Sequence, residues 1–83
     1  MTLLERATQA LHAEAPTLLN LGIGKAGIFG SVVRGVDGPD SDVDILIELQ
    51  ADHHLTLLSM VELEDELSSK LDKKVDLVVG SVP

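Results

Sequence analysis

Eighty-three residues, 45% of them hydrophobic, fit one small domain spanning residues 1–83 with a modest core. Fourteen acidic residues against six basic ones give a net charge of −8, which opposes broad contact with nucleic acid, and the absence of cysteine excludes disulfides and thiolate metal sites. No apolar run approaches the roughly 18 residues of a membrane span and no basic leader precedes the first helix, so we expect a cytoplasmic protein that binds neither nucleic acid nor membranes.

The first third of the chain is predicted to form a helix and then a strand. Thr2 and Glu5 fit a capping box at the start of the helix. That helix should end near Pro16, because the residue before a proline avoids the helical conformation. The short apolar segment 25–29 suits a first strand that is buried by its neighbours.

A glycine and a serine, Gly30 and Ser31, follow this strand. Ser31 is a good N-cap for a short helix that runs to Arg34. The free backbone N–H groups at a helix start suit a phosphate, and a glycine lets the backbone approach it closely. The segment therefore predicts a phosphate-binding turn, although Gly30 could be a turn residue alone and Arg34 a surface ion-pair partner.

The second strand, from about residue 42 to 49, alternates in character. Its apolar residues fall on one face: Val43, Ile45, Ile47 and Leu49. Asp42 and Asp44 share the opposite face, with Cα atoms about 7 Å apart. Two adjacent carboxylates repel each other unless a cation lies between them, and Mg²⁺ binds carboxylate and phosphate oxygens. The pattern indicates metal-assisted phosphate chemistry; the alternative is an edge strand with two solvated acids.

A second main helix and a third strand complete the chain. The helix ends near residue 71, and its predicted apolar stripe consists of Leu57, Met60, Val61, Leu67 and Leu71. The third strand spans 75–79, and the helix before it is long enough for a right-handed crossover, so the second and third strands should be parallel neighbours. Asp76 would then lie beside Asp42 and Asp44, unless it is a plain surface acid. His53 and His54 point apart and are interpreted as a solvated loop.

A known family carries the same three motifs in the same order. They are here Gly30-Ser31-x-x-Arg34-Gly35, Ser41-Asp42-x-Asp44 before an apolar strand, and Val75-Asp76-Leu77. The chain resembles the nucleotidyltransferase superfamily of DNA polymerase beta and kanamycin nucleotidyltransferase, and it is most similar to the minimal nucleotidyltransferases. These are antitoxins that are usually encoded beside a HEPN-domain toxin.

The resemblance implies an α+β nucleotidyltransferase fold with a small mixed three-stranded sheet packed against helices, in the order helix, strand, short helix, strand, helix, strand. The implied ligands of two Mg²⁺ ions are three aspartates: Asp42, Asp44 and Asp76. Asp76 would also take the proton from the attacking hydroxyl. The implied ligands of the ATP phosphates lie in the turn: Gly30, Ser31 and Arg34.

The resemblance also implies a reaction: transfer of AMP from ATP to a tyrosine of a HEPN-type toxin, which silences its ribonuclease activity. The main alternative is a catalytically weak antitoxin that neutralises its partner by contact. Modification of a small-molecule antibiotic is a weaker alternative, because 83 residues offer little surface for a second pocket. The chain is expected to assemble with its partner or with further copies of itself.

Overall fold

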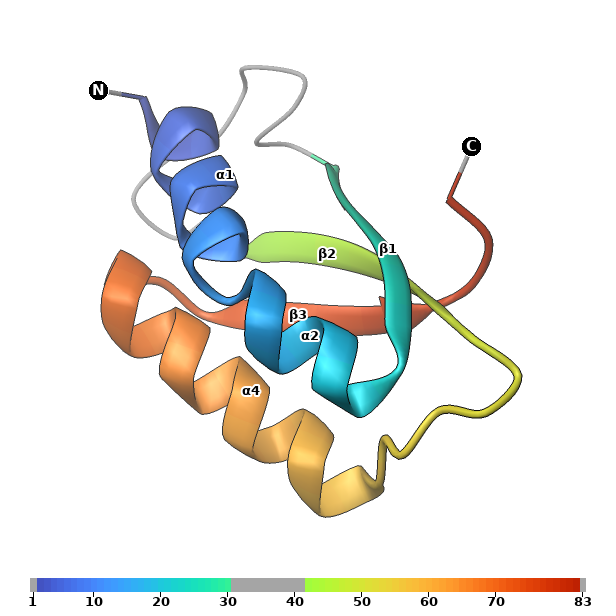
Figure 1. Cartoon of the computed structure of the whole chain (residues 1–83). Coiled ribbons are helices and arrows are strands. Elements are labelled where there is room, and N and C mark those ends of the chain that lie inside the picture. Colours follow the sequence, from blue (N-terminus) through green and yellow to red (C-terminus); the bar gives the residue numbers. More distant parts are fainter. Residues whose placement is uncertain (1, 31–41, 83) are drawn as a thin grey trace.

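The computed structural model describes residues 2–30 and 42–82, and within them it is an α+β fold of two layers (Figure 1). The helices are α1 (Leu3–Ala13), α2 (Ala15–Leu21) and α4 (Leu57–Leu71), and the strands are β1 (Ile23–Phe29), β2 (Val43–Leu49) and β3 (Val75–Val79). The sheet has the order β1-β2-β3, with β1 antiparallel and β3 parallel to β2. The predicted mixed three-stranded sheet and its parallel pair are therefore confirmed. The predicted short helix from Ser31 to Arg34 lies outside the described residues.

Helix α1 begins as the sequence predicts but ends earlier. The Thr2 Oγ1 atom accepts a hydrogen bond from the Glu5 N–H at 3.1 Å, and the Glu5 carboxylate accepts one from the Thr2 N–H, which closes a capping box. The predicted end near Pro16 is wrong. Helix α1 ends at Ala13, Glu14 separates it from α2, and Pro16 lies in the first turn of α2. A proline is tolerated there, since the first N–H groups of a helix need no partner within it.

The core lies between the helices and one face of the sheet. Its buried apolar residues are Ala7, Ala10, Leu11, Leu18, Ile23, Val43, Ile45, Ile47, Leu63, Leu67, Leu71, Val75 and Leu77. Val43, Ile45 and Ile47 are fully buried, so the predicted alternation of β2 is confirmed at these three positions. Strand β1 starts two residues earlier than predicted, at Ile23, which pairs with Leu49. The predicted burial of segment 25–29 is wrong, because β1 is an edge strand in which Ile23 is buried, Lys25 and Phe29 are exposed, and residues 26–28 are half-buried.

The apolar stripe of α4 differs from the predicted one. Leu57 and Val61 are 80% and 47% exposed, whereas Leu63, which the predicted stripe omitted, is 3% exposed. Leu63 precedes Leu67 and Leu71 by four and eight residues, so helical spacing itself puts it on their face, whereas the apolar residues of the first turn lie on several sides. Tertiary packing buries Leu63 together with Leu67 and Leu71.

Two polar contacts fasten the N-terminal helices to the end of α4. The Glu14 side chain is 6% exposed and binds the Lys70 Nζ atom at 2.5 Å, while Arg6 donates to the Leu71 carbonyl at 3.0 Å. The hydrogen bond that Lys70 donates to Glu14 raises the pKa of Lys70 above its ordinary value of 10.5, so the ammonium stays charged beside this buried carboxylate. These contacts join the N-terminal helices to α4 within the layer of helices.

Candidate active site

Asp44 and Asp76 are brought side by side by the parallel pairing of β2 and β3. Their Cα atoms are direct partners in the register, and Phe29 of β1 pairs with Asp44 from the other side. Because side chains alternate along a strand and the neighbours of Asp44 face the helices, Asp44 and Asp76 point to the open face of the sheet. Asp42 is half-buried and lies just before β2, two residues from Asp44.

The turn after β1 contacts the Asp44 carboxylate directly. Gly30 has a φ of +83°, and a Cβ atom added to it would come within 2.5 Å of the Asp44 Oδ2 atom. A glycine is needed at this position on both counts. The start of the predicted phosphate-binding turn therefore lies against a predicted metal ligand, while Ser31 and Arg34 lie outside the described residues.

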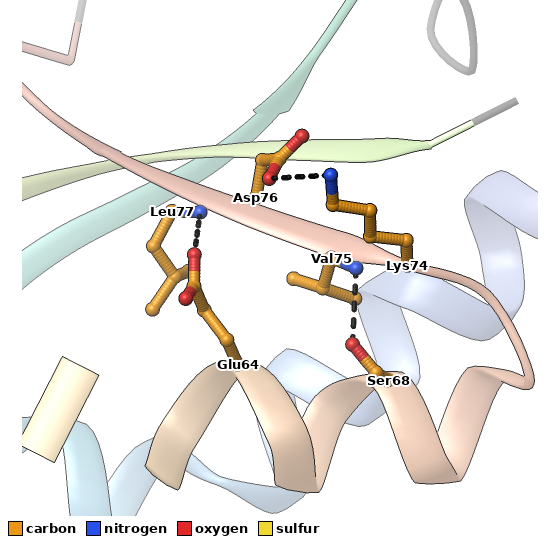
Figure 2. A network of polar contacts seen from close by, with 6 residues as sticks. All are labelled: Glu64, Ser68, Lys74, Val75, Asp76 and Leu77. Atoms are coloured by element: carbon orange, nitrogen blue, oxygen red, sulfur yellow. Dashed lines mark hydrogen bonds and ion pairs between the residues drawn. The ribbon is translucent and has the colours of Figure 1, made fainter. Parts of the chain in front are cut away.

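A lysine that the sequence analysis did not assign to the site stands beside the third aspartate. The Lys74 Nζ atom lies 4.0 Å from the Asp76 Oδ1 atom, and the two side chains are 70% and 41% exposed (Figure 2). The signal was present in the sequence, because residues two apart on an extended chain share a face. An exposed pair of this kind adds little stability, but its positive charge offsets part of the negative charge at Asp76.

Helix α4 positions β3 from below. The Glu64 carboxylate accepts a hydrogen bond from the Leu77 N–H at 2.9 Å, and the Ser68 hydroxyl accepts one from the Val75 N–H at 3.0 Å (Figure 2). Glu64 and Ser68 are four residues apart on one face of the helix. They hold the backbone on both sides of Asp76 and leave its side chain on the opposite, open face.

The other end of the open face is covered by the chain that follows β3. The Val82 N–H donates to the Glu48 Oε1 atom at 3.0 Å, and the Val82 side chain lies close to Gly27 of β1. The segment 80–82 thus crosses the face at Leu46 and Glu48. It leaves Asp44 half-buried and Asp76 partly exposed at the end near Gly30.

Within residues 2–30 and 42–82, no three acidic or histidine side chains are gathered closely enough to hold a metal ion between them. The backbone aligns Asp44 with Asp76, and Asp42 lies two residues before Asp44. His53 and His54 are exposed in the loop before α4, as the sequence predicts. No helix of the described part of the chain has the length and apolar character to span a membrane.

The fold and the aligned aspartates define a class of protein. Residues 13–81 match the family model of the nucleotidyltransferase domain. The chain therefore belongs to the nucleotidyltransferase family, and the predicted family, fold and enzyme class are confirmed.

Relatives with similar sequences are protein adenylyltransferases by name. The chain is 40% identical to the protein adenylyltransferase MntA of Thermococcus cleftensis over 82 residues, which cover 98% of this chain and 81% of the relative. It is 41% identical over 63 residues to a protein of Methanocaldococcus jannaschii assigned as a protein adenylyltransferase, covering 76% of this chain and 66% of that one.

Two solved structures are also similar. A structure assigned as a minimal nucleotidyltransferase superposes with a TM-score of 0.72 at 30% identity, covering all of this chain and 84% of the other. A crystal structure of a toxin–antitoxin with AMP-PNP gives a TM-score of 0.66 at 31% identity, covering 90% of this chain and 55% of that chain.

Proposed function

We propose that this chain transfers AMP from ATP to a tyrosine of a cognate HEPN-type toxin and thereby acts as an antitoxin. The observation that carries the proposal is the alignment of Asp44 with Asp76, beside Gly30, on an open face of the sheet. The similarity to a named protein adenylyltransferase supports the reaction, and the similarity to a toxin–antitoxin structure with AMP-PNP supports the nucleotide and the kind of partner.

The proposed metal ligands are Asp42, Asp44 and Asp76. Their oxygen atoms suit Mg²⁺, which binds carboxylates together with substrate phosphates. Two bound Mg²⁺ ions would neutralise phosphate charge and favour ionisation of the attacking hydroxyl. Asp44 and Asp76 are already neighbours in the register, so rotation of side chains, without movement of strands, is enough to bring their carboxylates together.

The chain's own residues would orient the substrates and move one proton. The tyrosine oxygen forms a bond to the α-phosphorus of ATP, the bond from that phosphorus to the bridging oxygen breaks, and pyrophosphate leaves. Asp76 accepts the proton of the hydroxyl. Gly30 and Ser31 hold the β- and γ-phosphates with Arg34 assisting. These 83 residues contain no tyrosine, so the acceptor lies outside them.

The decisive experiment uses radiolabelled ATP, Mg²⁺ and a HEPN-type protein whose gene lies beside the gene for this chain. We expect label on a toxin tyrosine, and we expect the double variant Asp42→Asn/Asp44→Asn to abolish transfer while its melting curve remains cooperative. Undiminished transfer by this variant would overturn the metal site. If the variant transfers nothing but still neutralises the toxin in cells, the contact-only antitoxin is the correct function.

A further inference from the structure

The outer edge of β3 is closed over its first half and open over its second. Successive N–H groups of a strand point to alternate edges, and those of Val75 and Leu77 point outward to Ser68 and Glu64. The Gly80 N–H donates inward to the Ile47 carbonyl at 2.9 Å, so the Val79 N–H also points outward. In the part of the chain described, no hydrogen bond reaches that N–H.

Ser68 and Glu64 of helix α4 cap the first half of this edge. Toward the start of the helix, apolar side chains take the place of these polar ones. One turn before Glu64, Met60 and Val61 have no polar atom that could reach the Val79 N–H. Figure 1 shows the start of α4 and the end of β3 toward the same end of the molecule. Four exposed side chains of these two segments are here named the β3–α4 patch: Leu57 (80% exposed), Leu58 (67%), Val61 (47%) and Val79 (50%).

The charge around the β3–α4 patch selects the kind of partner. Before Lys70, helix α4 carries four acidic residues, Glu62, Glu64, Asp65 and Glu66, and no lysine or arginine. Glu62, which follows Val61 in the sequence, and Asp65, one turn after Val61 on α4, are both exposed. A second copy of the chain, with its net charge of −8, would be repelled, whereas a basic partner would be attracted.

We propose that the β3–α4 patch docks an extended, apolar segment of the toxin that is flanked by basic residues. The identity of the partner rests on the proposed function. The segment would add a strand at Val79, and its apolar side chains would cover Leu57, Leu58 and Val61. Because the patch lies at the end of β3 and the start of α4, the docked segment would leave Asp44 and Asp76 on the open face uncovered.

The test measures binding of the cognate HEPN-type toxin by titration calorimetry. The double variant Leu57→Glu/Leu58→Glu should bind at least about tenfold more weakly, because it places charges in an apolar contact. Both side chains are exposed and glutamate suits a helix start, so its melting curve should match that of the parent. The matched control is Leu19→Glu on α2, where an equally exposed leucine (64%) lies outside the patch and binding should be unchanged.

Hydrogen exchange provides a second readout that does not depend on a variant. In the free chain the Val79 amide should exchange faster than that of Leu77, and the toxin should slow it. Normal binding by the double variant, or an unprotected Val79 amide in the complex, would refute the docking surface while leaving AMP transfer intact. If the parent protein neither binds nor modifies the toxin, the proposed function is wrong as well. If the parent protein forms a dimer and the double variant does not, the patch is an interface between two copies of the chain, and the proposal of a basic partner is wrong.

Discussion

The two faces of β2, a strand of seven residues, differ in their surroundings: one packs in the core, and the other carries Asp44 on the open face. Val43, Ile45 and Ile47 are fully buried against the helices, whereas Asp44 and Leu46 are half-buried on the open face. Strand geometry separates the two sets, because each residue points opposite to its neighbour. Stability and the proposed chemistry can therefore be changed one at a time, and substitutions one residue apart should have different consequences.

The largest expected change in stability comes from the covered face. Ile45→Ala should lower the free energy of unfolding by about 2–5 kcal/mol, because it leaves a cavity in a fully buried site. Leu46→Ala, one residue along, should cost less, since Leu46 is only half-buried. Urea titrations of the two variants test this order, and equal losses would contradict the assignment of faces.

The next largest change in stability is expected on the open face and requires Mg²⁺. Mg²⁺ at 100 times its dissociation constant should stabilise the parent by about 2.7 kcal/mol, because only the folded chain aligns the aspartates. Asp44→Asn should remove most of this gain and change stability little in EDTA. Glu48→Gln is the matched control, because Glu48 lies on the same face at the end covered by Val82. Thermal melts with Mg²⁺ or EDTA measure the difference, and equal Mg²⁺ shifts in all three proteins would place the cation elsewhere.

A smaller effect is expected at the junction between β1 and the open face. Gly30→Ala should cost about 1–2 kcal/mol for the left-handed backbone alone, and its Cβ atom would push against the Asp44 carboxylate. We therefore expect AMP transfer to fall as well. Gly24→Ala is the control, because the three atoms nearest to an added Cβ there all belong to the flexible Gln50 side chain. Full transfer by Gly30→Ala would show that contact with Asp44 does not matter.

The smallest change in stability is expected from the ion pair between Lys70 and Glu14. The raised pKa of Lys70 means that the pair with Glu14 stabilises the fold at neutral pH and that this contribution is lost as the pH climbs above 10.5. Lys70→Met should destabilise the chain at pH 7 more than Lys25→Met, an exposed control on β1. Urea unfolding between pH 7 and 11.5 should show the difference between Lys70→Met and the parent shrinking at the alkaline end. A difference independent of pH would assign it to packing.

Short-range patterns in the sequence predicted the three strands, the buried face of β2 and the family. The alternation of β2 at Val43, Ile45 and Ile47 and the capping box at Thr2 follow from rules that act over a few residues, and both are confirmed, as is the parallel pairing of β2 and β3. The three motifs also led to the nucleotidyltransferase family without any structure. The roles of Asp42, Asp44 and Asp76 remain predictions.

Tertiary structure decided what depends on contacts between distant segments. The first turn of α4 carries apolar residues on several sides, and only docking against the sheet decides that Leu57 stays exposed. The closeness of Gly30 to Asp44, and the capping of the Leu77 N–H by Glu64, join residues 13 or more positions apart. Such contacts are set by the register of neighbouring strands and by the path of the helix beneath them, which local propensity does not encode.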